Sequence, residues 1–173
     1  EECQTNLDRL KTCGSVYFTE ISTQFDPPTL TENHVVIDGL FGSGLNKPLN
    51  GGFAAVVKYI NASKAQVVAI DIPSGLMGED NTYNVRPNIL RADVTLSIQL
   101  PKLSFLFPEN EDIVGDWELL DIGLKQSFID TAASVYSIIE EADILSLIKP
   151  RKRFAHKGTF GHGLLIAGSY GMA

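Results

Sequence analysis

The 173-residue chain has few cysteines and few basic residues, and each shortage excludes a class of protein. Its two cysteines, Cys3 and Cys13, indicate neither a disulfide framework nor a zinc site, so a reducing, cytoplasmic compartment is expected. Lysine and arginine total 14 against 21 aspartates and glutamates, and the net charge of -7 argues against a nucleic-acid binder. No apolar run is long enough to span a membrane, so no membrane partner is expected.

Short apolar runs followed by polar turns are what the chain does contain. Residues 34–38, 66–71, 93–98 and 117–121 indicate strands, and the first two are continuous runs typical of strands buried on both faces of a parallel sheet. Apolar residues at helical spacing over 53–60 lie between those two runs. These elements predict a βαβ unit with the right-handed crossover of nearly all such units, and hence an α/β fold.

Further elements are expected towards the two ends. The opening residues are polar and helix-like, and a short strand is predicted over 16–21. The composition shifts after about residue 130, where we expect a short helix over 136–148 and an apolar strand over 164–167. The basic run 151–158 could be a targeting or anion-binding patch, but we interpret it as a solvated junction. Both ends look cut, so we expect the chain to be a fragment.

Two aspartates, Asp38 and Asp71, end the first two predicted strands. Ligands of open parallel sheets bind outside the carboxyl ends of the strands, and neighbouring strands lie roughly 4.8 Å apart. Two carboxylates that close raise one pKa or attract a cation. Each aspartate could instead only cap the turn after it, but two at equivalent positions favour a functional role. Lys102, after the third strand, could contact an anionic substrate or be an ordinary exposed lysine.

The loop that follows Asp38 is rich in glycine and short polar residues. Its members of interest are Gly42, Ser43, Gly44, Leu45, Asn46, Lys47 and Pro48. Glycines let the backbone approach a ligand closely, and such a loop leading into a helix can cradle phosphate. It matches neither the Walker motif nor a complete dinucleotide-binding glycine motif, so alone it is a weak signal.

A second loop, 71–75, follows the second strand and contains Ser74 beside Asp71. Ser74 can present its hydroxyl group to the pocket that the aspartates would share. A Ser–His–Asp triad is a poor alternative, because neither His34 nor His156 has an evident route to Ser74.

Six segments occur in an order that resembles the NAD(P)H-hydrate epimerase family. They are residues 38–49, 60–63, 71–76, 91–95, 101–103 and 121–124. Residues 156–162 with 164–171 resemble the opening of the ADP/ATP-dependent NAD(P)H-hydrate dehydratase domain, which many bacteria fuse to the epimerase. The resemblance covers residues 30–173.

This resemblance implies part of a Rossmann-like three-layer parallel sheet over residues 1–130. It implies a junction and the first strand of a ribokinase-like α/β domain over 131–173. The first domain would interconvert the R and S epimers of hydrated NADH and NADPH. The second would dehydrate the S epimer with ADP or ATP, and the family's epimerase domains often form homodimers.

The family's site residues are carried over by motif. Asp38 and Ser74 are expected to bind a potassium ion, and the loop from Gly42 to Pro48 is expected to line the phosphate site. Asp71 is expected to contact the hydrated nicotinamide ring and to act there as general acid and base. The family's first phosphate loop and the dehydratase nucleotide site are missing, so we expect the chain alone to be inactive.

Two other functions are compatible with parts of the sequence. A Rossmann-like domain could bind a nucleotide or a protein without catalysis, but such a module would not need Asp38, Asp71 and Ser74. A sugar or vitamin kinase is suggested by the last segment, and it would require a glycine-rich anion hole with an aspartate further along the chain.

Overall fold

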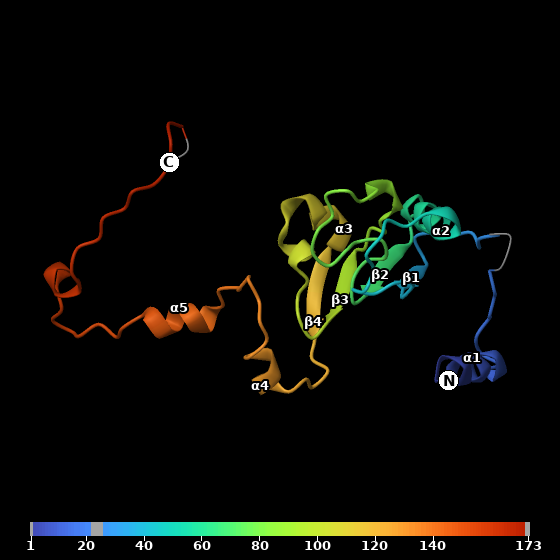
Figure 1. Ribbon diagram of the computed structural model, residues 1–173, viewed down its shortest axis with the longest axis horizontal. Helices are drawn as coiled ribbons and strands as arrows, with labels where there is room; N and C mark the ends of the chain where they lie inside the picture. The colour runs from blue at the N-terminus through green and yellow to red at the C-terminus, as the bar shows by residue number, and fades with distance from the viewer. Residues whose placement is uncertain (1, 22–25, 172–173) are drawn as a thin grey trace. The chain divides into compact units, whose positions relative to one another are not determined.

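The computed structural model describes residues 2–21 and 26–171. The chain divides into two units, Glu1–Ile129 and Asp130–Ala173, which are described separately. The helices and strands of the first unit are α1 (Glu2–Thr12), β1 (Val35–Asp38), α2 (Gly51–Asn61), β2 (Gln66–Ile70), η1 (Arg86–Asn88), β3 (Val94–Ile98), η2 (Leu103–Leu106), η3 (Pro108–Asn110), α3 (Glu111–Val114), β4 (Asp116–Leu120) and α4 (Gln126–Ile129) (Figure 1). The second unit contains α5 (Glu141–Leu147) and η4 (Lys157–Phe160). In the described residues, no helix has the length and apolar character needed to cross a membrane.

The four strands form one parallel sheet in the order β1-β2-β3-β4. All four predicted strands of the central region are present, each within about one residue of the expected bounds. The predicted helix between the first two is α2, which completes the expected βαβ unit. The α/β fold predicted from the apolar runs is therefore confirmed.

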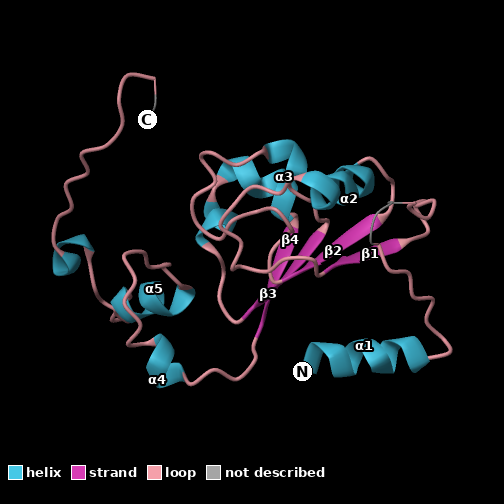
Figure 2. Ribbon diagram, turned by 45° about the vertical axis from the view of Figure 1, so that its right-hand side comes forward, coloured by secondary structure: helices cyan, strands magenta, loops and turns pink. Residues whose placement is uncertain are grey.

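The chain adds its strands in one direction across the sheet, from β1 to β4. Right-handed crossovers in one direction all fall on the same face, and Figure 2 shows α2 and α3 on one side of the strands. The other face leaves Val35 and Ile37 of β1 58% and 62% exposed. The prediction that this strand is buried on both faces is therefore wrong for the described chain, because the described crossovers cover one face only.

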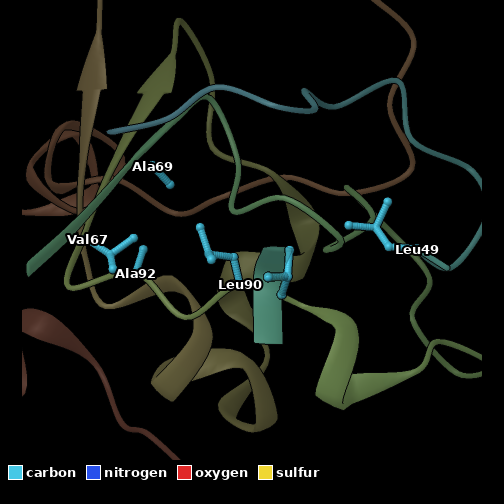
Figure 3. Close-up of a cluster of buried hydrophobic side chains, with 6 residues drawn as sticks. Leu49, Val67, Ala69, Leu90 and Ala92 are labelled. Atoms are coloured by element: carbon cyan, nitrogen blue, oxygen red, sulfur yellow. The ribbon is translucent and has the colours of Figure 1, made fainter. Parts of the chain in front are cut away.

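Two apolar clusters lie beneath the covered face. The first comprises Leu49, Val57, Val67, Ala69, Leu90 and Ala92, and it joins α2 to β2 (Figure 3). The second comprises Ile72, Leu76, Ile89, Phe105, Ile113 and Val114. Val57 is completely buried, a burial that contributes about 1.5–3 kcal/mol for a side chain of this kind. The loop after β2 contributes Ile72 and Leu76 to the second cluster, so the core itself fixes the backbone around residues 71–75.

Three predictions near the ends are corrected. Neither 16–21 nor 164–167 forms a strand, because a strand needs a neighbouring strand for its backbone N–H and C=O groups. Leu164, Leu165 and Ile166 are accordingly 86–88% exposed. The helix expected over 136–148 is the shorter α5, whose start is set by a capping box between Glu140 and Asp143.

Candidate functional site

The carboxyl ends of β1 and β2 carry the two predicted aspartates. The strands are parallel neighbours, with Asp38 in register with Ala69, and Asp71 follows the last residue of β2. The two exit loops meet through hydrogen bonds from Ser74 to Asp38 and from Ser43 to Asp71. The structure thus brings Asp38, Asp71, Ser74 and the start of the glycine loop to one edge of the sheet, as the strand-end argument predicts.

Asp38 and Ser74 form a buried hydrogen-bonded pair. The Ser74 hydroxyl donates to Asp38 Oδ1 at 2.7 Å, and the Ser74 backbone N–H donates to Asp38 Oδ2 at 2.7 Å. Backbone N–H groups of Leu40 and Phe41 donate to Asp38 Oδ1 and to Ser74 Oγ. Asp38 is 3% exposed and Ser74 is fully buried, so the exit from β1 and the loop after β2 are tied together away from water.

The fit of this pair to potassium rests on its oxygen atoms. Hard cations take carboxylate and hydroxyl oxygens as ligands, and both are present. Within the described chain, no lysine or arginine forms an ion pair with Asp38, so a buried carboxylate stands without a positive partner. Ser74 Oγ already donates one hydrogen bond and accepts another, which leaves one lone pair for a cation. The pair offers oxygen ligands to a hard cation that takes its remaining ligands elsewhere. The described residues contain no group of three histidine, cysteine, aspartate or glutamate side chains that could hold a metal.

Asp71 lies between two loops and is 14% exposed. Lys102 Nζ lies 2.8 Å from Asp71 Oδ1, and the Ser43 backbone N–H donates to Oδ2 at 3.0 Å. Partial burial by itself raises the pKa of Asp71, but the hydrogen bonds from Lys102 and Ser43 and the Lys102 charge outweigh it and hold the pKa below its ordinary value. Asp71 is therefore ionised at neutral pH.

The glycine loop runs along the rim of the site. A Cβ atom on Gly42 would lie 3.3 Å from Asp71 Oδ2, so this glycine permits the close approach of loop and carboxylate. Ser43, Gly44, Asn46 and Lys47 are exposed, whereas Leu45 packs against the first apolar cluster. Pro48 is half-buried. The loop therefore has one anchored apolar residue and an open polar surface that leads into α2.

The entry into α2 leaves its first N–H groups without a side-chain cap. Asn50 precedes the helix but makes no capping hydrogen bond. The rings of Phe41 and Phe53 meet edge to face, with centroids 4.9 Å apart, and fix the loop against the first turn of the helix. Uncapped N–H groups at a helix start can receive an anion, and the phosphate role of this loop stays a prediction.

Two residues make contacts that the sequence does not predict. Lys102, which the sequence presents as a substrate contact or, at least as readily, an exposed lysine, pairs with Asp71. Asn88 lies in what the sequence shows only as a polar loop; its amide donates to Leu49 O at 2.6 Å and its Oδ1 is buried without a partner in the described chain. Neither His34, which bonds to Thr31, nor His156 hydrogen-bonds to Ser74 among the described residues.

Replacing Ser74 with alanine is expected to destabilise the protein by about 1–3 kcal/mol, because Phe41 N–H and Asp38 Oδ1 each lose a buried hydrogen-bond partner. Urea unfolding of the full-length protein measures this change. Ser137→Ala removes the hydroxyl of an exposed serine and serves as the control, with a change expected within about 0.5 kcal/mol. Equal unfolding midpoints for the two variants would show that the Ser74 network contributes nothing.

A comparison with protein families places this chain. The family described as "YjeF-related protein N-terminus" matches residues 1–104. The chain is 36% identical over 135 residues to the bifunctional NAD(P)H-hydrate repair enzyme Nnr of Thermofilum pendens. The aligned residues make up 78% of the chain and 25% of that enzyme. It is 32% identical to the enzyme of the same name from Moorella thermoacetica, over 99% of the chain and 32% of the enzyme.

A relative with a single activity in its name also matches. The chain is 32% identical over 98 residues to the NAD(P)H-hydrate epimerase of Limosilactobacillus fermentum, which covers 57% of the chain and 46% of that protein. The chain spans about a quarter to a third of the length of the two bifunctional relatives.

Proposed function

The chain belongs to the family of YjeF-related protein N-terminal domains, and on that premise we propose that it is part of an NAD(P)H-hydrate epimerase. In this proposal, residues 1–130 are the later part of the epimerase domain. Residues 131–173 form a junction and the start of a dehydratase domain, which would act on the S epimer with ADP or ATP. The match to the bifunctional Moorella enzyme over 99% of the chain supports this division of roles.

One contact carries the proposal, the hydrogen bond from Ser43 N–H to Asp71 Oδ2. It joins a loop suited to phosphate to an ionised carboxylate at the same edge of the sheet. A dinucleotide whose phosphates lie on Gly42 to Pro48, near Lys47 and the start of α2, would have its hydrated ring within reach of Asp71. Loop, helix start and carboxylate are the three parts that such a substrate requires.

The chemistry proposed for Asp71 follows from its charge. Inversion at the hydrated ring carbon requires the C–O bond to break and to form again on the opposite face. The departing hydroxyl group takes a proton from solvent and leaves as water, so the ring carries positive charge, which an ionised carboxylate beside it stabilises. When water adds to the other face, Asp71 can accept the proton that this water loses and return it to solvent.

Asp38 and Ser74 would hold the potassium ion. When bound, the ion supplies positive charge beside a carboxylate that is 3% exposed. The two residues would also help to fix the position of the Asp71 carboxylate. Asp71 and Ser74 belong to one short loop that packs on the core.

The test is the conversion of the R epimer of hydrated NADH to the S epimer, followed by chromatography with the full-length protein. We expect conversion above the uncatalysed rate, and faster conversion in potassium than in sodium at equal ionic strength. Acceleration that is the same in both salts would remove potassium from the proposal. A folded protein that gives no acceleration would refute the epimerase function and favour a non-catalytic nucleotide- or protein-binding module.

A further inference from the structure

Lys102 is held more firmly than an exposed lysine would be. Its Nζ lies 2.8 Å from Asp71 Oδ1, and it donates to Ser97 Oγ at 3.1 Å, Ile98 O at 3.2 Å and Leu100 O at 3.0 Å. An ammonium group has three N–H donors, so these four acceptors use its whole capacity. The side chain is 15% exposed. Lys102 is therefore committed to the protein rather than free to capture a substrate anion.

Matching turns at the ends of two neighbouring strands bring Lys102 and Asp71 together. Ile72 N–H donates to Ile70 O around Asp71, and Leu100 N–H donates to Ile98 O around Gln99. The central residues have φ of +70° and +61°, so each turn is the rarer, strained γ-turn with positive φ. At the central residue of each turn the sheet ladder still continues, because Asp71 N–H donates to Leu96 O and Gln99 N–H donates to Leu120 O.

Such strain costs about 1–3 kcal/mol for each non-glycine residue and persists only where the surroundings enforce it. Here two strained turns lie side by side, and their product is a short contact between a carboxylate and an ammonium group. The second turn contains none of the residues to which the proposed epimerase site assigns a role. The position of this turn beside the site is explained if the turn brings Lys102 into contact with Asp71.

We propose that Lys102 is a positioning residue for Asp71, which fixes the plane of the carboxylate and preserves its negative charge when the substrate covers the site. This inference rests on the proposed epimerase function. The carboxylate torsion of an aspartate is broad and has no sharp minimum of its own. Contacts on both oxygens, from Lys102 to Oδ1 and from Ser43 N–H to Oδ2, remove that freedom.

The charge of Lys102 matters most when water leaves the site. A bound substrate would desolvate Asp71, and desolvation disfavours the ionised carboxylate. Lys102 is the charged group that faces Asp71 among the described residues, and the glycine loop contributes the neutral Ser43 amide. Attraction between the ammonium group and the carboxylate strengthens as the surroundings become less polar, so the pair compensates for the loss of water.

The test compares Lys102→Met and Lys102→Arg in the full-length protein. Methionine keeps an unbranched stem and removes the charge, so we expect kcat to fall roughly 100-fold with KM for hydrated NADH changed less than about threefold. The acidic limb of the rate profile should move to higher pH, because the pKa of Asp71 rises without the cation. Arginine should restore part of kcat and return the limb towards its original position. Lys58→Met, at an exposed lysine of α2, is the matched control and should behave like the wild type.

A double variant separates positioning from a general loss of structure. If Lys102 acts through Asp71, adding Lys102→Met to Asp71→Asn should lower kcat little further. If the two residues act independently, the fold-losses in kcat of the two single variants would multiply in the double variant. Wild-type kcat and an unmoved acidic limb in Lys102→Met would overturn the inference and leave the epimerase function standing. Fold-losses in kcat that multiply in the double variant would overturn the inference as well. So would equal losses of kcat in Lys102→Met and Lys102→Arg with the acidic limb of the rate profile unmoved. A wild-type protein without activity would instead refute the function itself. In that case, an Asp71 carboxyl pKa by NMR that is equal in wild type and Lys102→Met would overturn the positioning role too.

Discussion

Asp71→Asn is expected to lower the rate of epimerisation by about 10²–10⁴-fold while leaving the protein folded. The amide has the shape of the carboxylate but can neither stabilise the positive ring nor accept a proton. The change adds no new backbone strain, since asparagine tolerates positive φ as well as the aspartate that it replaces, and Asp71 has φ +70°. Lys102 keeps its acceptors on Ser97, Ile98 and Leu100, so it is not left unsatisfied.

The measurement is the R-to-S conversion of hydrated NADH in potassium buffer, with thermal unfolding recorded on the same preparations. Asp26→Asn makes the same chemical change at an exposed aspartate and should leave the rate unchanged. Full activity in Asp71→Asn would remove Asp71 from the chemistry and leave it as a turn residue.

Gly75→Ala is expected to lower the free energy of unfolding by about 3 kcal/mol or more. Gly75 has φ +98°, and a Cβ atom there would lie 2.5 Å from Asn88 O and 2.9 Å from Ile89 Cα. Both contacts are with backbone that cannot move freely, because Ile89 belongs to the second apolar cluster and the Asn88 side chain is bonded to Leu49 O. Relief of the clash would displace Ser74 and with it the contact to Asp38.

Urea unfolding compared with Gly78→Ala tests this prediction. Gly78 lies in the same loop, lacks positive φ, and has no atom within 4 Å of the position a Cβ would take. Its substitution is expected to change stability by no more than about 1 kcal/mol. Similar midpoints for the two variants would show that the loop yields to the added methyl group.

The central sheet could be predicted because its signals are local. The runs at 34–38 and 66–71 are continuous and apolar, and the helix between them has the right spacing, so β1, α2 and β2 follow from periodicity. The meeting of Asp38 with the loop after Asp71 then follows from parallel pairing alone. The expected strands at 16–21 and 164–167 have similar apolar content. A strand forms only when a neighbouring strand pairs with its backbone, and the pattern of apolar residues in one segment does not show whether such a neighbour is present.

The parts of the site that could not be predicted depend on contacts between distant segments. The pairing of Lys102 with Asp71 requires two strained turns, and neither Asp71 nor Gln99 is the glycine that normally signals positive φ. Asn88 resembles any polar loop residue in the sequence, although it is 8% exposed. Its position is fixed by Gly75 and Leu49, which are far from it along the chain.

The positive φ at Asp71 also limits which residue types can occupy position 71. Glycine adopts positive φ without strain, and asparagine and aspartate adopt it at a lower cost than other residues, so a library screened for folding alone should be enriched in those three at position 71. A screen for epimerisation should reduce these three residue types to aspartate alone. A paralogue with asparagine at this position would therefore have kept the architecture while losing the reaction.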